Sequence, residues 1–145
     1  LKNIGLEPLS AEFNAEYLAS YFKNRKAPIK SVIMDNKILV GVGNIYASES
    51  LFLTRINPLK PAQNLTKSEI LELTQSIILV LNQAIQEGGT TLRDFVNGDN
   101  KPGYFKQKLN VYDRKNLGCY SCTTKIVRIV QSGRATYFCP TCQKI

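Results

Sequence analysis

The chain has 145 residues, of which 43% are hydrophobic and 21% are charged. This length suits one ordinary domain, or a helical body with a small appended module, and the composition argues against a wholly disordered chain. The most apolar run, residues 77–81, is far shorter than the roughly 18 residues that a membrane span needs. No signal peptide opens the chain, so we expect no membrane association and a cytoplasmic setting. Histidine is absent, which excludes a histidine-containing metal site and a Ser-His-Asp triad.

The net charge of +8 is concentrated in the last third of the chain. Residues 1–100 contain ten basic and ten acidic residues, whereas residues 101–145 contain nine basic residues and one acid, Asp113. Positive charge separated in this way favours a polyanionic partner, and nucleic acid is the commonest candidate. From charge alone, a solvated basic surface that improves solubility explains the pattern equally well.

Three helices are predicted in the first part of the chain. An N-capping serine and apolar residues at helical spacing predict a helix from residue 10 to about residue 26. Pro28 fits the first turn of a second helix, which runs from residue 29 to about residue 35. A glycine-rich break over residues 41–44 then precedes a third helix over residues 45–53.

The fourth predicted helix, over residues 66–87, carries the clearest pattern. Thr66 and Glu69 form a capping box, and apolar residues recur every three or four positions. Gly88-Gly89 ends the helix. The segment over residues 90–118 is predicted to be mostly loop.

Four cysteines in the last 27 residues form two Cys-x2-Cys pairs, and they are Cys119, Cys122, Cys139 and Cys142. This spacing is typical of a four-thiolate zinc site, in which each pair makes a tight knuckle that aims both sulfurs at one ion. The alternatives are two disulfides, four ordinary buried thiols or an iron–sulfur cluster. We predict one structural zinc ion per chain, because four protein ligands leave no open position for water.

The residues between the two cysteine pairs predict a β-hairpin. Residues 125–130 alternate and are rich in β-branched side chains, which favours a strand. Residues 131–134 are expected to form the turn and residues 135–138 the returning strand. The end of the chain is therefore expected to be a two-stranded zinc hairpin.

The segment Gly41-Val42-Gly43-Asn44-Ile45-Tyr46-Ala47 places two glycines and Asn44 at the beginning of a helix. Exposed backbone N–H groups and the helix dipole suit a phosphate there, and the Asn44 side chain adds a donor. Ordinary turn and cap chemistry explains the same residues.

Several segments, taken in order, resemble the formamidopyrimidine-DNA glycosylase family over nearly the whole chain. The segments are Pro28-Ile29-Lys30, Asp35-Asn36, Gly41 through Glu49, Gly88 through Phe95, Gly103-Tyr104-Phe105, Val111-Tyr112 and the cysteine hairpin with Gly133-Arg134-Ala135-Thr136. The first three look like the family's helix–two-turn–helix core. The related endonuclease VIII branch shares this outline, but Gly88-Gly89-Thr90-Thr91 is more similar to the formamidopyrimidine branch.

The resemblance implies a role in the repair of oxidised purines in DNA. Such an enzyme flips 8-oxoguanine or a ring-opened purine out of the helix, cuts its glycosidic bond and then nicks the strand. The family's nucleophile is an N-terminal proline amine in a β-domain that Leu1-Lys2 and the following residues do not resemble. The resemblance therefore implies the DNA-binding C-terminal half of a bifunctional glycosylase and AP lyase. We expect this half to be inactive alone.

The resemblance also assigns DNA-contacting residues. Lys30 and Asn44 match the family's phosphate-binding pair, and Arg25 matches a basic DNA contact. Arg134 matches an arginine that grips phosphates beside the lesion and is assigned as the proton donor of the second elimination. Because a guanidinium keeps its proton above about pH 12, we favour stabilisation of the departing phosphate.

The loop that closes over the flipped base is implied for residues 90–95, with Thr90, Leu92, Arg93, Asp94 and Phe95 as its candidate residues. Thr123 departs from the family's pattern, because a glycine is common after the second cysteine.

The predicted fold is mainly α, with a helical helix–two-turn–helix body over residues 1–100 and a basic loop and zinc hairpin over residues 101–145. The expected partners are double-stranded DNA and a missing N-terminal catalytic domain, and we expect a monomer that associates with the bacterial nucleoid. Two alternatives stay open at this point, a stand-alone zinc ribbon that binds RNA or a ribosome-like assembly, and a structural module. Neither alternative needs the segments over residues 41–49 and 88–95.

Overall fold

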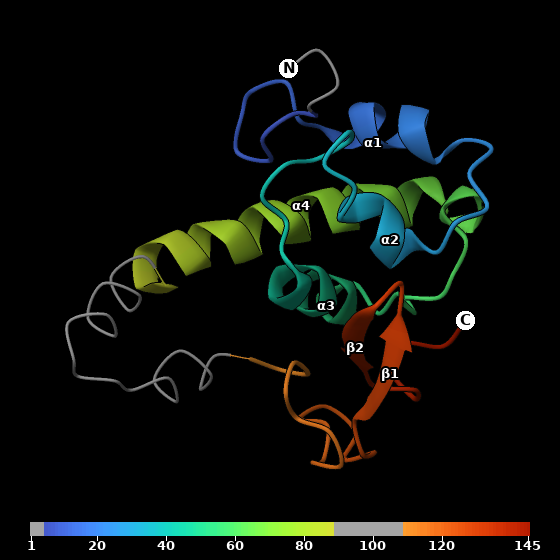
Figure 1. Cartoon of the computed structure of the whole chain (residues 1–145), viewed down its shortest axis with the longest axis vertical. Helices are drawn as coiled ribbons and strands as arrows, with labels where there is room; N and C mark the ends of the chain where they lie inside the picture. Colours follow the sequence, from blue (N-terminus) through green and yellow to red (C-terminus); the bar gives the residue numbers. More distant parts are fainter. Residues whose placement is uncertain (1–4, 89–108) are drawn as a thin grey trace.

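The computed structural model describes residues 5–88 and 109–145. In chain order the elements are α1 (Ala15–Phe22), α2 (Ile29–Ile33), α3 (Asn44–Leu53), the 3-10 helix η1 (Ala62–Asn64), α4 (Lys67–Gln83), the π-helical turn η2 (Ala84–Gly88), β1 (Val127–Gln131) and β2 (Arg134–Phe138). The helices form one body, and the hairpin lies against α3 on the side away from α1 (Figure 1). The mainly α fold with a terminal hairpin is therefore confirmed. None of the described helices is long and apolar enough to cross a membrane.

Helix α4 is the centre of the body, and its predicted beginning is confirmed. The Thr66 hydroxyl accepts from the backbone N–H of Glu69 at 3.1 Å, and the Glu69 carboxylate accepts from the backbone N–H of Thr66 at 2.9 Å. This reciprocal pair satisfies two of the N–H groups that a helix leaves unpaired at its start. The helical path reaches Gly88 as predicted, but its last turn, η2, has π-helical hydrogen bonding.

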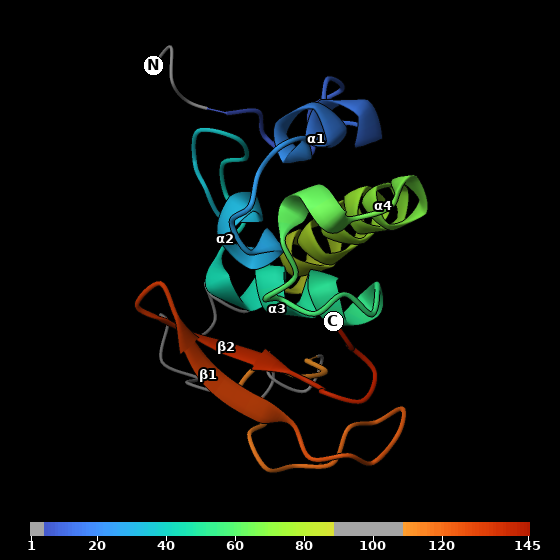
Figure 2. The same ribbon diagram turned by 90° about the vertical axis from the view of Figure 1, so that its right-hand side faces the viewer.

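The core of the body lies between α4 and the three shorter helices. Figure 2 shows α4 with α1 on one side and α3 on the other. The side chains buried there are apolar and come from every helix, and they include Leu18, Phe22, Ile29, Ile33, Leu51, Leu73 and Ile77. This packing fixes the relative positions of α2 and α3, the two helices that face the hairpin.

The predicted beginning of the first helix at residue 10 is wrong. The Ser10 hydroxyl donates to the carbonyl of Glu7 at 2.7 Å and closes a separate turn. Helix α1 begins at Ala15 because the Asn14 side chain accepts from the backbone N–H of Tyr17 at 2.8 Å. Both residue types cap helices well, so residue type alone does not decide between them.

The first helix also ends before residue 26. The backbone leaves the helical conformation at Lys23, with ψ of 128°, and continues with a left-handed Asn24 at φ of 63°, so α1 ends at Phe22. The second helix is one turn of five residues with Pro28 as its N-cap. The third helix begins one residue earlier than predicted, at Asn44, with Gly43 as its N-cap.

The hairpin turn is tighter than predicted. The strands are antiparallel with Gln131 opposite Arg134, so only Ser132 and Gly133 form the turn. Both have positive φ, 54° and 78°, as the two-residue turns that match the twist of a hairpin require. The predicted four-residue turn over residues 131–134 is therefore wrong, and Arg134 is the first residue of β2.

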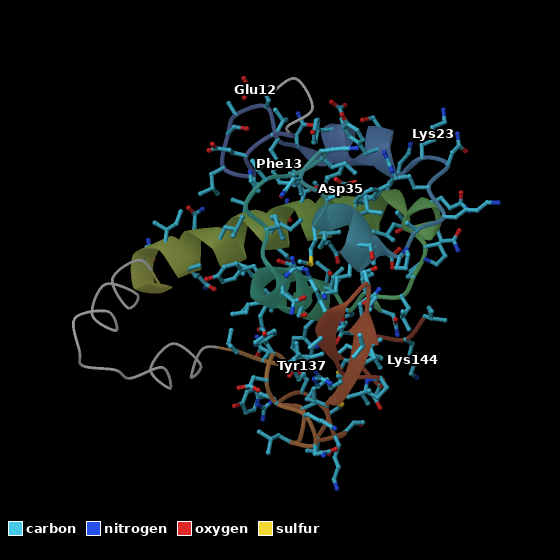
Figure 3. The ribbon with its side chains drawn as sticks, in the orientation of Figure 1. Glu12, Phe13, Lys23, Asp35, Tyr137 and Lys144 are labelled. Carbon is cyan, nitrogen blue, oxygen red and sulfur yellow. The ribbon has the colours of Figure 1, made fainter. Side chains whose placement is uncertain are left out.

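The first strand begins two residues later than predicted. Lys125 and Ile126 form isolated bridges with Gly118 and Lys115 and do not pair with β2. They hold the loop over residues 109–126 against the hairpin. Tyr137 lies on the hairpin beside this loop, and its ring meets that of Tyr112 at 4.9 Å between centroids (Figure 3).

A buried glutamate joins this loop to the helical body. The Glu49 carboxylate on α3 is 3% exposed and accepts from the backbone N–H groups of Asn110, Val111 and Tyr112 at 2.7 to 2.9 Å. The Asn110 side-chain amide donates to it as well, at 3.1 Å. These four bonds satisfy a buried charge that would otherwise be costly.

A second set of buried hydrogen bonds joins the Cys139–Cys142 segment to the residues that follow α3. Gln143 is fully buried, accepts from the backbone N–H of Cys139 at 2.8 Å and donates to the carbonyl of Ile56 at 2.9 Å. The Asn57 amide donates to the carbonyl of Gln143 at 2.8 Å. The hairpin is therefore docked on the helices through several hydrogen bonds. The predicted domain boundary at residues 100 and 101 lies outside the described residues.

Candidate functional site

The four cysteine sulfurs lie within 4.8 Å of one another. The Cys119 and Cys142 sulfurs are 3.8 Å apart, and those of Cys122 and Cys139 are 3.4 Å apart. A disulfide needs about 2.05 Å, so the sulfurs are not paired. Sulfurs at the corners of a tetrahedron with metal–sulfur bonds of about 2.3 Å lie about 3.8 Å apart, which is the geometry of one zinc ion. An iron–sulfur cluster would have to place several atoms between the thiolates.

Both knuckles direct backbone N–H groups at sulfur. The N–H of Ser121 donates to the Cys119 sulfur at 3.4 Å, and the N–H of Cys142 donates to the Cys139 sulfur at 3.3 Å. Such donors favour the thiolate, the form that binds metal. Thr123 adopts a left-handed backbone with φ of 64°, which costs a residue with a Cβ about 1–2 kcal/mol and explains why glycine suits this position. The site holds one structural zinc ion.

A buried lysine lies where the helices meet the hairpin. Lys30 on α2 is 2% exposed, and its ammonium donates to the Asn44 amide oxygen at 2.5 Å and to the Thr136 hydroxyl at 2.8 Å. The Asn44 amide nitrogen donates to the carbonyl of Ala135 at 2.8 Å. The two predicted phosphate-binding side chains, Lys30 and Asn44, are thus brought together by α2, α3 and β2.

A cavity of about 310 Å³ opens between α2 and the hairpin turn. The residues that line it are mostly polar and are Lys30, Ser31, Met34, Asp35, Gln131, Ser132 and Arg134. Asp35 lies just beyond α2 in the body (Figure 3). Burial, with a smaller contribution from the nearby positive charge of Arg134, lowers the pKa of the Lys30 ammonium to about 8.

This arrangement suits an anion. Two positive groups line one cavity, and the ammonium has three N–H donors, of which two have protein acceptors in the described structure. Among the described residues no carboxylate forms an ion pair with Lys30 or Arg134. An oxyanion in the cavity would supply the missing acceptor and offset the repulsion between the two cations.

Two other sets of candidate residues lie elsewhere. Arg25 does not line the cavity, because its guanidinium donates to the carbonyl of Tyr21 at 2.7 Å and lies over that residue's ring. The candidate lesion-loop residues Thr90, Leu92, Arg93, Asp94 and Phe95 lie outside the described residues.

The roles of the residues that hold the lysine and the loop in place carried little signal in the sequence. Thr136 and Gln131 belong to the hairpin, and their connection with Lys30 has no signal in spacing because it spans more than 100 positions. Glu49 had a weak signal, since it closes the glycine-rich helix segment that resembles the family. Gln143 had none beyond its place after the last cysteine.

Residues 4–96 match the family described as the formamidopyrimidine-DNA glycosylase H2TH domain, and residues 119–145 match the zinc finger found in FPG and IleRS. Among curated relatives, the formamidopyrimidine-DNA glycosylases of Hydrogenovibrio crunogenus and Rickettsia felis are each 57% identical, over 99% and 97% of this chain. The alignments cover 51% of both relatives, so the chain spans about half the length of the curated relatives it matches.

Solved structures give the same result. The MutM (Fpg) protein of Thermus thermophilus is 40% identical with a TM-score of 0.86, over 97% of this chain and 54% of that one. Lactococcus lactis Fpg in complex with abasic-site DNA is 33% identical with a TM-score of 0.86, over 99% of this chain and 53% of that one. In sequence and in fold, the chain belongs to the formamidopyrimidine-DNA glycosylase family and corresponds to the part of it that carries the H2TH domain and the zinc finger.

Proposed function

We propose that this chain is the DNA-binding C-terminal half of a bifunctional DNA glycosylase and AP lyase that excises oxidised purines. The observation that carries the proposal is that Lys30 from α2 and Arg134 from the zinc hairpin line one cavity, with the Lys30 ammonium bonded to Asn44 of α3. Relatives support the substrate class, since Lactococcus lactis Fpg is described bound to abasic-site DNA and to Fapy-dG-containing DNA.

In this proposal the chain grips the phosphates of the damaged strand. Lys30 places a desolvated ammonium against one phosphate, where low dielectric strengthens the attraction. Asn44 orients that ammonium through its amide oxygen. Arg134 projects from the hairpin as an exposed guanidinium that binds the same or the adjacent phosphate with two N–H groups.

Holding phosphates on both sides of a nucleotide stabilises the backbone distortion that accompanies base flipping. The loop over residues 90–95 closes over the flipped base, and Arg25 contacts the backbone farther along the duplex. Arg134 also stabilises the phosphate that departs in the second elimination. The zinc ion has a structural role and supports the hairpin that carries Arg134.

The chemistry that breaks the glycosidic bond belongs to an N-terminal catalytic half, with its proline nucleophile. Residues 1–145 contain no segment that resembles it, so the chain alone binds DNA but does not excise a base. We divide it into a helical domain over residues 1–100 and a basic zinc module over residues 101–145, which act together on DNA. It acts as a monomer, in the cytoplasm at the nucleoid.

Duplex binding and its salt dependence test the proposal. Fluorescence anisotropy with a labelled duplex should show an affinity that falls steeply with salt, because Lys and Arg displace counterions from phosphates. Lys30→Met should weaken binding by about 1–3 kcal/mol and lower the salt slope by about one phosphate contact. Lys67→Met, at an exposed position of α4, is the matched control and should bind like the parent chain.

The same measurement separates the alternative functions. A stand-alone zinc ribbon for RNA would prefer single-stranded RNA of equal length over the duplex. A structural module would bind both the duplex and the RNA weakly, and the salt dependence of that binding would be no steeper than that of a non-specific basic surface. Equal duplex affinities for Lys30→Met and Lys67→Met would rule out a phosphate site at Lys30.

A further inference from the structure

Four hydrogen bonds close a ring around Lys30. Its ammonium donates to the Thr136 hydroxyl at 2.8 Å, and that hydroxyl donates to the Gln131 amide oxygen at 2.9 Å. The Gln131 amide nitrogen donates to the carbonyl of Pro58 at 3.1 Å. The same carbonyl accepts from the backbone N–H of Lys30 at 3.3 Å, so both ends of the lysine belong to the ring.

The ring is buried and joins four parts of the chain. Thr136 is fully buried and Gln131 is 9% exposed, so water does not replace these bonds freely. The members come from α2, the loop after α3, β1 and β2. Donors and acceptors point the same way around Lys30, Thr136 and Gln131, and aligned hydrogen bonds of this kind strengthen one another.

From this geometry we infer that Thr136 and Gln131 are positioning residues that hold the Lys30 ammonium in the cavity between α2 and the hairpin turn. The inference rests on the proposed phosphate contact of Lys30 and deepens it. The hydroxyl and the Asn44 amide oxygen fix two of the three ammonium N–H groups. The direction of the third N–H is thereby restricted, so the lysine loses little rotamer entropy when phosphate binds.

The ring also gives the desolvated ammonium a hydrogen-bond acceptor, which favours its charged form. The charged groups that line the cavity with Lys30 are Arg134 on β2, which disfavours the ammonium, and Asp35 after α2, whose carboxylate accepts from the backbone N–H of Lys37. The pKa of Lys30 is already lowered to about 8. Removal of the Thr136 acceptor should therefore lower it further, since hydrogen bonds to the charged form favour that form.

The test compares Thr136→Val, Thr136→Ser and the control Thr74→Val in the full zinc-loaded chain. Thr74 is also buried, and its hydroxyl donates to Ile70 within α4, away from the cavity. Two quantities are measured: duplex affinity at pH 7, and the Lys30 pKa by NMR titration of labelled lysine, assigned by the signal lost in Lys30→Met. Zinc content and helical circular dichroism monitor folding.

We expect Thr136→Val to weaken duplex binding roughly tenfold and to lower the Lys30 pKa. Thr136→Ser should restore both, and Thr74→Val should change neither. In a Lys30→Met background, Thr136→Val should have no further effect on binding. If Thr136→Val does not bind zinc, Gln131→Met takes its place, with a smaller loss in the same direction.

Two results would overturn the inference. One is an unchanged Lys30 pKa in Thr136→Val. The other is an equal loss of duplex affinity on Thr136→Val in the parent chain and in the Lys30→Met background. These results differ from failure of the proposed function. If Lys30→Met bound DNA like the parent chain, the proposed phosphate contact of Lys30 would be wrong. If Lys30→Met lost affinity and Thr136→Val did not, the phosphate contact would stand and the positioning role of Thr136 would be wrong.

Discussion

The exposed guanidinium of Arg134 and the buried ammonium of Lys30 make different contributions to one cavity. Lys30 is held by Asn44 and Thr136, whereas within residues 5–88 and 109–145 Arg134 is placed by its strand pairing with Gln131 and by no side-chain hydrogen bond. A rigid hairpin end presents the guanidinium without fixing its side chain. In the proposed function, the lysine therefore binds phosphate at a fixed position, and the arginine adapts its side chain to the phosphate.

Arg134→Ala should leave zinc content and thermal stability nearly unchanged, because among the described residues its side chain has no ion-pair partner. Duplex affinity should fall by about 1–3 kcal/mol, and the salt slope should fall by about one contact. Anisotropy over a salt series measures both. Arg128→Ala, at an exposed position of β1, serves as the control. Unaltered affinity in Arg134→Ala would mean that the hairpin only stabilises the fold.

In an enzyme reconstituted with a catalytic half, Arg134→Ala should impair base release and strand nicking together if the guanidinium positions phosphate. Loss of the second elimination alone, with base release intact, would favour a proton-donor role instead. Product analysis on an 8-oxoguanine duplex distinguishes the two roles, because each step leaves a different strand end.

Duplex affinity should depend on pH through Lys30. Phosphate favours the ammonium, so DNA raises the Lys30 pKa above its value of about 8 in the free chain. Between the two pKa values binding takes up a proton, and affinity falls as pH rises. The affinity should therefore be constant below about pH 7 and decline through pH 8 to 9. Lys30→Met should remove this decline, and its persistence would assign the titration to another group.

At the scale of elements, the bonds of Glu49 make α3 the support for the loop over residues 110–112. Glu49→Gln replaces one acceptor oxygen with a donor that faces backbone N–H groups. We expect the free energy of unfolding to fall by about 2–3 kcal/mol, as for buried hydrogen bonds to a charged group. Urea denaturation measures it. Glu72→Gln, at an exposed position of α4, should stay within about 0.5 kcal/mol of the parent chain.

Zinc supports the hairpin but not the helical core. The helical cluster contains no cysteine, whereas the cluster around Phe52, Val111 and Ile126 includes Cys119 and Cys139. Binding of such an ion contributes about 10–16 kcal/mol, more than a short hairpin supplies on its own. Cys139→Ser, or a strong chelator, should therefore unfold the hairpin and leave most helical circular dichroism.

Metal analysis should find one zinc ion per parent chain and none in Cys139→Ser. Because Thr136 belongs to the hairpin, loss of zinc should also release Lys30 and abolish the pH dependence of DNA binding. An intact, exchange-protected hairpin in a metal-free chain would contradict this account.

For the whole molecule, we expect the 145 residues to bind duplex DNA with little preference for a lesion and to release no base. The phosphate contacts that we propose lie within residues 1–145, and the family resemblance of these residues covers no part of the catalytic half. Incubation with duplexes that contain 8-oxoguanine or an abasic site, followed by strand analysis, should show neither base release nor nicking. Base release or nicking by the pure chain, in proportion to its concentration, would contradict the proposal that catalysis needs an N-terminal half.

Some features of this protein are determined by its sequence alone, because they depend on neighbours along the chain. Two cysteines three positions apart can form a knuckle locally, and two such pairs separated by a predicted hairpin predicted the metal centre. Thr66 and Glu69 are likewise one helical turn apart, and their capping box was predicted correctly. The family resemblance also rests on ordered local segments.

Tertiary structure decided the features that depend on distant parts of the chain. Ser10 and Asn14 are both residue types that cap helices, and only the three-dimensional structure identifies Asn14 as the cap of α1. The two-residue turn placed Arg134 in β2 and placed Gln131 opposite it in β1, where Gln131 joins the hydrogen-bonded ring around Lys30. Lys30 and Thr136 are 106 positions apart. The hydrogen bond between them forms only when the core and the zinc site have fixed the helices and the hairpin together. Local propensity acts over a few residues, whereas hydrogen bonds form wherever folding brings two groups within about 3 Å.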